Sequence, residues 1–337
     1  MNILVLGAGT MGNAHAAAYT EMKDVTLCGI VDVNFEKAAQ LADKCGTKAF
    51  SSYEEAKQQI VDIDVVSVCL PTPLHKETVL QAARDKFHVI CEKPLARHLA
   101  DAREMIDFCE QQGVRLFVGH VVRFFPEYVQ AKEVVDSQKI GQPVIARTTR
   151  GGAFPNASND WYANFIKSGG LILDTVIHDF DFLRWCFGEV ERVYAKTSRG
   201  RAAGKLEYSL VTLRFENGVI AHVEGTWAHQ NFHTKLEIAG KEGIIQHDST
   251  SVSPVVVEKS ASVDEVVGVA VPSSPTQYSP YYLEIEHFIS CIKEGKEARV
   301  TAEDAYKALE ISLAALQSIE SGEPVYLKQF SSLEGVK

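Results

Sequence analysis

Residues 1–12 read MNILVLGAGTMG, an apolar run that ends in the glycine pattern G-x-G-x-x-G. The apolar run predicts a buried strand, and the Ala-rich residues 13–22 that follow predict a helix. In this setting Gly7 permits a tight turn, Gly9 lets the backbone approach a pyrophosphate, and Gly12 lets helix and strand pack closely. Backbone N–H groups at the helix start can then hold the phosphates. We therefore expect dinucleotide contacts from Gly7, Gly9, Thr10, Met11 and Gly12.

The residue at the end of the second predicted strand indicates which dinucleotide binds. This strand, VTLCGIVD, ends at Asp32, about 20 residues after Gly12. A carboxylate at this place suits the free ribose hydroxyls of NAD and repels the 2′-phosphate of NADP. Val33 and Asn34 follow, so no arginine stands there to receive that phosphate. The sequence therefore predicts NAD as the cofactor.

Strand and helix patterns continue to alternate as far as His120. Six strands of this kind predict a doubly wound parallel sheet of order 3-2-1-4-5-6, which binds ligands at the carboxyl ends of its first and fourth strands. The fourth predicted strand, IDVVSVCL, ends at residues 71–75, PTPLH, where the prolines turn the backbone across the crevice. Pro71, Thr72 and His75 are candidate cofactor contacts, and His75 is equally well explained as a helix-start residue.

The fifth predicted strand, FHVICEKP, carries charge to the same edge of the sheet in Glu92 and Lys93. A solvated surface pair of these residues would contribute little to stability, so their position at the carboxyl end of a buried strand needs another explanation. We expect both residues beside the cofactor, with Lys93 positioned by Glu92 or its neighbours.

Residues 169–188, GGLILDTVIHDFDFLRWCFG, carry a polar stripe on an otherwise apolar segment. Glycines at both ends and apolar residues nearly all round predict a buried helix. Asp174, His178 and Asp181, at i, i+4 and i+7, share one face at about 100° per residue. A buried carboxylate or imidazole is costly unless it is paired or works on a ligand. The stripe therefore lines a cavity, our preferred interpretation, or forms a self-satisfied core network.

The regular alternation ends after His120, so we place a dinucleotide-binding domain at 1–121 and a substrate-binding and oligomerisation domain at 122–337. Six further strands are predicted at 142–152, 189–199, 206–215, 218–228, 232–240 and 243–249. Asn217-Gly218 predicts a hairpin between two of them. Residues 254–258 are a possible short strand, and 261–277 are predicted as a loop. Two helices are expected at 280–293 and 301–321, and the second begins with a capping box from Thr301 to Asp304.

Composition excludes several classes of protein. A chain of 337 residues is long for a single hydrophobic core, so two domains are expected. Its 46% hydrophobic and 23% charged residues are typical of a soluble globular protein. The formal net charge of -10 argues against nucleic acid and anionic membranes as partners. Seven scattered cysteines without C-x-x-C spacing indicate a reducing compartment, and no leader or membrane-length apolar run is present. We expect a cytoplasmic protein.

Together, GAGTMGNAH, Asp32, PTPLH, Glu92-Lys93-Pro94, RFFPEY and GGLILDTVIHDFD resemble the glucose–fructose oxidoreductase and inositol dehydrogenase family, in the family's order along essentially the whole chain. The resemblance implies an α/β protein whose Rossmann domain is joined to an α+β domain with a large, open-faced, mainly antiparallel sheet. It implies catalytic roles for Lys93, Asp174 and His178, and substrate contacts from Arg123 and Asp181. It also implies a cis bond between Lys93 and Pro94.

These features predict an NAD-dependent dehydrogenase acting on a secondary hydroxyl of a sugar or cyclitol. His178 is expected to take the hydroxyl proton as general base, because imidazole titrates near working pH. Asp174 would orient that imidazole or bind an adjacent hydroxyl. Lys93 would donate to the reacting oxygen and stabilise its developing charge. Asp174, His178 and Asp181 could instead hold a metal ion, but a nicotinamide supplies the redox chemistry itself, so none is expected.

Ring side chains in the second half are candidates for shaping a sugar pocket, because flat rings suit the C–H faces of a polyol. They are Trp161, Tyr162, Trp227 and His229, and core packing also explains each of them. We take Trp161 and His229 as candidate substrate contacts. We expect a neutral substrate. The alternative is a substrate with an anionic group bound by an arginine, and the candidates are Arg123, Arg147 and Arg150.

Two functional alternatives stay open: an enzyme that retains NAD through net epimerisation, elimination or hydrolysis, and an NAD-binding sensor without catalysis.

Assembly is predicted from residues 206–215, which place Tyr208 and Leu210 on one face of a strand and Val211, Leu213 and Phe215 on the other. Because an exposed second apolar face would be a liability, we expect a homodimer or homotetramer formed through the open sheet.

Overall fold

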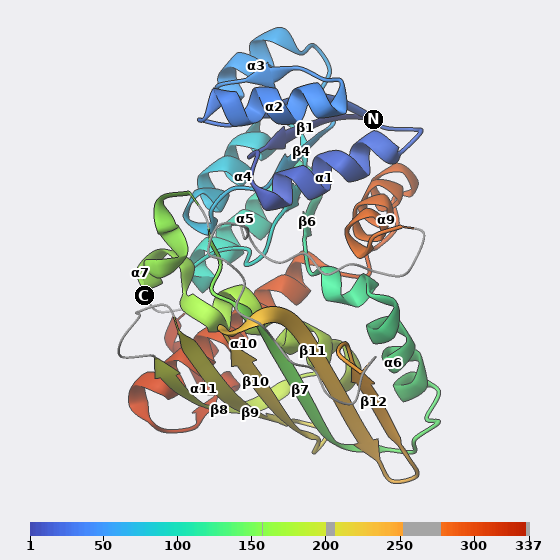
Figure 1. Ribbon diagram of the computed structural model, residues 1–337, viewed down its shortest axis with the longest axis vertical. Coiled ribbons are helices and arrows are strands. Elements are labelled where there is room, and N and C mark those ends of the chain that lie inside the picture. Colours follow the sequence, from blue (N-terminus) through green and yellow to red (C-terminus); the bar gives the residue numbers. More distant parts are fainter. Residues whose placement is uncertain (157, 200–205, 252–277, 335–337) are drawn as a thin grey trace. The chain divides into compact units, whose positions relative to one another are not determined.

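The computed structural model describes every residue except 157, 200–205, 252–277 and 335–337 (Figure 1). The strand at 254–258 and the loop at 261–277 that the sequence predicts lie outside the described residues. The chain divides into two compact units, one of residues 1–124 and 273–306 and the other of residues 125–272 and 307–337. Helix α9, Pro280–Glu294, therefore joins the N-terminal unit, which differs from the expected division at residue 121. The reason is that the apolar face of α9 belongs to the core of that unit.

The first unit is organised around a six-stranded sheet of order β3-β2-β1-β4-β5-β6 in which every neighbouring pair is parallel. Its strands are β1 Asn2–Leu6, β2 Thr26–Val31, β3 Ala49–Phe50, β4 Val65–Val68, β5 His88–Cys91 and β6 Leu116–Val118. The order confirms the predicted doubly wound sheet, with β1 and β4 as neighbours. The carboxyl ends of these two strands are therefore adjacent, as the ligand site of such a sheet requires.

Helices connect the strands of this sheet. They are α1 Thr10–Glu21, α2 Phe35–Cys45, α3 Tyr53–Gln59, α4 His75–Arg84 and α5 Leu99–Gln112, with 3-10 turns at Thr72–Leu74 and Val121–Phe124. The side chain of Asn34 caps α2 by accepting a hydrogen bond from the N–H of Lys37, and Gly46 ends the helix at φ +66°. Cap residues of these types are what the chain needs to stop and start helices between short strands.

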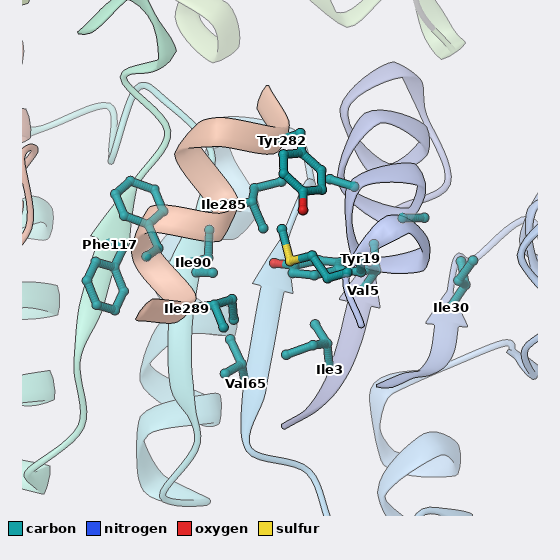
Figure 2. Close-up of a cluster of buried hydrophobic side chains, with 14 of the residues drawn as sticks. Ile3, Val5, Tyr19, Ile30, Val65, Ile90, Phe117, Tyr282, Ile285 and Ile289 are labelled. Atoms are coloured by element: carbon teal, nitrogen blue, oxygen red, sulfur yellow. The ribbon is translucent and has the colours of Figure 1, made fainter. Parts of the chain in front are cut away.

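One face of the sheet forms the core shared with α1 and α9 (Figure 2). Alternate strand residues contribute to it, because side chains on a strand point to opposite faces in turn. The members labelled in Figure 2 are Ile3, Val5, Tyr19, Ile30, Val65, Ile90, Phe117, Tyr282, Ile285 and Ile289. Ser67 and Glu92 follow Val65 and Ile90 by two residues, so the same alternation directs these polar side chains to this face.

The second unit contains a seven-stranded sheet of order β12-β11-β7-β10-β9-β8-β13. Its strands are β7 Pro143–Ala153, β8 Val190–Arg199, β9 Glu207–Phe215, β10 Ile220–Thr226, β11 Ala228–Gly240, β12 Ile244–Asp248 and β13 Val325–Tyr326. Among the strands that the structure describes in this sheet, only β7 and β10 pair in parallel, so the mainly antiparallel sheet is confirmed. The hairpin at Asn217-Gly218 is confirmed too, with Gly218 at φ +94°. The sequence does not predict β13, because two residues carry no periodicity.

The two faces of this sheet differ in exposure. On β9 the side chains of Ser209, Val211, Leu213 and Phe215 are buried, whereas Tyr208 and Leu210 on the other face are 38% and 43% exposed. The division of residues between faces is the one that the sequence predicts. On the exposed face, Arg147 of β7 stands opposite Glu237 of β11.

The helical elements of the second unit are α6 Pro126–Asp136, a 3-10 turn Ser158–Ala163, α7 Phe165–Ser168, a π-helical turn Ile172–Val176, α8 Ile177–Phe187 and α11 Leu327–Glu334. Helix α10, Ala302–Ser321, runs through the division at residue 306. Its predicted capping box is confirmed: the Thr301 hydroxyl accepts the Asp304 N–H at 3.0 Å, and the Asp304 carboxylate accepts the Thr301 N–H at 3.0 Å. Among the described residues, no helix combines the length and apolar character needed to cross a bilayer.

Candidate functional site

The glycine turn between β1 and α1 has the shape that a pyrophosphate requires. Gly7 lies at φ +102°, where an added Cβ would collide with the carbonyl oxygen of Cys69. An added Cβ on Gly12 would collide with the carbonyl oxygen of Gly7. At Gly9, by contrast, an added Cβ would meet no described atom within 4 Å. Packing therefore demands two of the glycines, and the third lies beside open space at the start of α1, where helix N–H groups favour phosphate.

Asp32 lies directly beside this turn. One carboxylate oxygen accepts the N–H of Ala8 at 2.8 Å, and the other accepts the N–H of Asn34 at 2.8 Å. These bonds fix the carboxylate at the carboxyl end of β2. The next side chain, Val33, is almost fully exposed. The structure thus brings together the turn and the acidic residue that the sequence predicts as cofactor contacts.

His75, the first residue of α4, is a buried cross-link between two strand ends. Its Nε2 lies 2.8 Å from the carbonyl oxygen of Leu70, and its Nδ1 lies 3.0 Å from that of Pro94. Burial lowers the pKa of this imidazole. The ring therefore lies between residues 70–72, after β4, and residues 94–95, after β5, and the single N–H of a neutral imidazole donates to one of these two sides. In this arrangement both ring nitrogens contact backbone carbonyl oxygens. Pro71 and Thr72 lie at the adjacent 3-10 turn.

The segment after β5 carries the candidate cation. The Lys93–Pro94 peptide bond is cis, as the resemblance implies. The carboxylate of Glu92 is buried and accepts the backbone N–H of Lys93 at 3.1 Å. Its other oxygen lies 3.0 Å from Nε2 of His15, a fully buried residue of α1. No sequence pattern singled out His15, although an imidazole on an Ala-rich helix three residues after Gly12 was a signal for a buried polar contact.

The polar stripe begins with a change of helix type. Residues Ile172–Val176 form a π-helical turn, and α8 follows from Ile177. A π turn closes its hydrogen bonds over five residues rather than four, and such turns inside helices are frequent at functional sites. Asp174 lies within this turn and is buried, whereas His178 and Asp181 lie on the regular helix. The expectation of one α-helical face therefore holds for the last two residues and is altered at Asp174.

Asp174 is oriented by neighbours from its own turn and from the sheet. The hydroxyl of Thr175 donates to its carboxylate at 3.2 Å, and Nε1 of Trp227 donates to that hydroxyl at 3.0 Å. Trp227 is buried and packs edge-to-face on Phe154, with ring centroids 5.0 Å apart. An added Cβ on Gly225 of β10 would collide with Val176, so this glycine lets the π turn pack directly on the sheet. Thr175 was also missed from sequence, because a threonine beside an aspartate carries no pattern.

The remaining predicted residues occupy several places. The rings of Trp161 and Tyr162, in the 3-10 turn Ser158–Ala163, lie 4.1 Å apart between centroids and are tilted by 30°. His229 lies exposed on β11, and its ring centroid is 4.4 Å from that of His233. In the first unit, the buried Arg123 donates to the carbonyl oxygen of Arg299 at 2.9 Å. Among the described residues, no three His, Cys, Asp or Glu side chains gather as a metal site.

Two other arginines raised by the sequence are engaged with carboxylates. Arg150 is buried and donates to Asp179 at 2.7 Å and 3.3 Å, and to the Tyr128 hydroxyl at 3.2 Å. Arg147 pairs with Glu237 on the exposed face of the sheet. Because its guanidinium is neutralised inside the core, Arg150 offers no charge to an anionic substrate.

Comparison with known proteins agrees with these features. A family model described as "Oxidoreductase family, NAD-binding Rossmann fold" matches residues 1–120, and one for the GFO/IDH/MocA C-terminal domain matches residues 128–246. The chain is 32% identical to myo-inositol 2-dehydrogenase of Thermotoga maritima, over 98% of this chain and 99% of that protein. It is 30% identical to scyllo-inositol 2-dehydrogenase (NAD(+)) of Bacillus subtilis, over 96% and 95%.

A crystal structure of a myo-inositol dehydrogenase from Corynebacterium glutamicum superposes with a TM-score of 0.80 at 26% identity, covering 97% of this chain and 98% of that one. The family suggested by the sequence motifs is therefore confirmed along both halves of the chain. The glycine turn, the strand order and these full-length similarities together show that the chain belongs to the GFO/IDH/MocA family of oxidoreductases, with an NAD-binding Rossmann fold.

Proposed function

We propose that the chain is an NAD-dependent dehydrogenase that oxidises a secondary hydroxyl of a cyclitol or sugar. The observation that carries the proposal is the π turn at the start of a buried helix. It contains Asp174, four residues before His178. A core that needed only packing has no use for an ionisable pair at this position. Relatives named as inositol 2-dehydrogenases, at 30% and 32% identity over nearly the full chain, support a polyol as the substrate class.

NAD is the proposed cofactor. The open backbone at Gly9 and the N-terminus of α1 would hold its pyrophosphate. The Asp32 carboxylate, fixed by two backbone N–H groups, would accept the ribose hydroxyls and repel a 2′-phosphate. When bound there, NAD would supply the hydride acceptor for the oxidation. Asp32→Ser should narrow the preference for NAD over NADP, and equal affinity of the wild type for both would contradict this assignment.

Three side chains would carry the proton chemistry. His178 accepts the proton of the reacting hydroxyl and returns it in the reverse direction. Asp174, held by Thr175, binds the adjacent hydroxyl or orients the imidazole. Lys93 donates from Nζ to the reacting oxygen and stabilises the charge that develops on it. Asp181 and Arg123, with the rings of Trp161 and His229, are the proposed substrate contacts; these four are carried over from the resemblance and the sequence pattern.

The proposal extends to assembly and location. Exposed apolar side chains on one face of the second sheet support a homodimer or homotetramer formed through that face; they include Tyr194, Tyr208 and Leu210. A homo-oligomer with closed symmetry would cover them. A monomer in light scattering at micromolar concentration would contradict this part of the proposal. Seven scattered cysteines without C-x-x-C spacing support a cytoplasmic location.

The decisive experiment is a panel of myo-inositol, scyllo-inositol and common hexoses with NAD, followed by NADH absorbance. His178→Gln should lower single-turnover hydride transfer about 10²- to 10⁴-fold, and Lys93→Met about 10²- to 10³-fold, with NAD affinity nearly unchanged. His222→Gln, on the exposed face of β10, is the matched histidine control. If His178→Gln keeps full turnover but unfolds at a lower temperature, the stripe is a core network. If substrate is converted without accumulation of NADH, the cofactor is retained through the cycle.

A further inference from the structure

A buried polar chain lies under the carboxyl edge of the first sheet and ends at Lys93. Its centre is His15, whose side chain has no solvent exposure. Nδ1 of the ring lies 2.7 Å from the hydroxyl of Ser67 on β4, and Nε2 lies 3.0 Å from Oε1 of Glu92. Oε2 of Glu92 accepts the backbone N–H of Lys93 at 3.1 Å. One imidazole on α1 is thus connected to the candidate cation through a single carboxylate.

The two buried groups need each other. A carboxylate removed from water is costly unless a donor or counter-charge compensates it, and the imidazole of His15 supplies that. Although burial raises the pKa of Glu92, the hydrogen bond and charge of His15 bring it below its ordinary value. Burial lowers the pKa of His15, but Cys69 and Glu92 raise it, and the result lies well above the ordinary value. Tyr19, on the next turn of α1, packs edge-to-face on the imidazole and completes its surroundings.

The surrounding backbone leaves Glu92 little freedom. An added Cβ on Gly119 would meet the carboxylate at 3.2–3.3 Å, so the main chain after β6 forms a wall against it. On the other side of Lys93, Nδ1 of His75 lies 3.0 Å and 3.3 Å from the carbonyl oxygens of Pro94 and Leu95. The backbone that carries Lys93 is therefore held before it through Glu92 and after it through His75.

We propose that His15 is a positioning residue for Lys93, acting through Glu92 to fix the backbone from which the catalytic ammonium projects. The inference rests on the proposed function, because it assumes that Lys93 donates to the reacting oxygen. His15 itself touches neither the substrate nor the cofactor in this scheme. Misplacement of a catalytic group by about 1 Å can cost about 10²-fold in rate, so an indirect contact of this kind is sufficient to affect turnover.

The test is a double-mutant cycle in the full chain with myo-inositol and NAD. His15→Gln should lower kcat roughly 10- to 100-fold and leave KM for myo-inositol and the NAD dissociation constant, measured by calorimetry, within about twofold. In the Lys93→Met background, His15→Gln should have almost no further effect, because a positioning residue has nothing left to position. Thr20→Val is the matched control: it removes from the same helix a hydroxyl that donates to the carbonyl oxygen of Ala16, outside the chain of His15, Ser67 and Glu92, and it should keep the wild-type kcat.

Glu92→Gln provides a second route if His15→Gln does not fold. It keeps the shape of the side chain and removes the charge that pairs with His15, so it should also lower kcat without weakening NAD binding. The inference is overturned if His15→Gln slows the Lys93→Met variant by the same factor as the wild type, or if both His15→Gln and Glu92→Gln retain full kcat. The proposed function fails separately, and visibly, if Lys93→Met alone retains full kcat.

Discussion

Removal of Arg150 should destabilise the second unit far more than removal of Arg147, although both arginines lie on β7. Asp179, the partner of Arg150, is fully buried, and the pair is joined by hydrogen bonds of 2.7 Å and 3.3 Å. Arg150→Met keeps the aliphatic volume but leaves a carboxylate unpaired in the core, which typically costs about 3–5 kcal/mol. Arg147 is 55% exposed in its pair with Glu237 on the opposite face, and pairs of that kind contribute about 0–1 kcal/mol.

The chain has a built-in reporter for this measurement. Its three tryptophans, at 161, 185 and 227, all lie in the second unit, so their fluorescence follows the unfolding of that unit. Urea titrations of Arg150→Met, Arg147→Met and wild type give the change in the free energy of unfolding from the shift in midpoint. The variant Arg150→Met with Asp179→Leu completes a cycle. Because the double change leaves no lone charge, it should cost much less than the sum of the single changes.

The outcome separates two accounts of the buried pair. If Arg150→Met lowers the free energy of unfolding by less than about 1 kcal/mol, like a surface pair, water must reach Asp179 and the burial argument is wrong. Additivity of Arg150→Met and Asp179→Leu would show equally that the two side chains do not depend on each other. Either result would also remove the reason for assigning Arg150 to the core rather than to an anionic substrate.

Three further outcomes are expected. Gly225→Ala should destabilise the second unit by about 1–3 kcal/mol, because the added methyl group collides with Val176 of the π turn. Gly152→Ala is the control and should cause no such loss, because its methyl group meets only ordinary van der Waals contacts. Urea midpoints of the two variants measure the difference. Thr301→Ala should cost about 0.5–2 kcal/mol through loss of the cap of α10, measured by thermal unfolding. His15→Gln should unfold at a higher pH on acidification, followed by circular dichroism. The stabilisation from the lowered pKa of Glu92 is lost as pH falls through that pKa, which rises without His15.

Much of the fold follows from periodicity in the sequence. Apolar runs in residues 1–120 predict six parallel strands in their observed order, because the topology rules for alternating strands and helices leave few arrangements. The alternation in β9 predicts which residues share a face, but not which of the two faces is buried. Two features escaped: β13 is only two residues long, and α9 joins the N-terminal unit from the far end of the chain. Neither is encoded locally, since both depend on contacts between residues widely separated in sequence.

The candidate site was predictable in its conspicuous residues and not in its supporting ones. Asp174 and His178 stand out because charge is rare on an apolar helix, and Glu92 and Lys93 because they end a buried strand. The π turn that displaces Asp174 was not predictable, because Gly225 on a distant strand permits its close packing on the sheet. A period of 3.6 residues cannot report a change of helix type.

The need to compensate buried charge explains which site residues could not be predicted from the sequence. Three buried acids show this requirement: Glu92 pairs with His15, Asp179 pairs with Arg150, and Asp174 accepts the hydroxyl of its neighbour Thr175, which Trp227 orients in turn. The acids belong to recognisable stretches, whereas His15, Arg150 and Trp227 are single residues in other parts of the chain. A charge inside an apolar core must be compensated at close range, so each acid implies a partner whose position only the fold reveals. Isolated polar residues in apolar elements, such as His15 in the Ala-rich helix α1, are therefore the ones to test first.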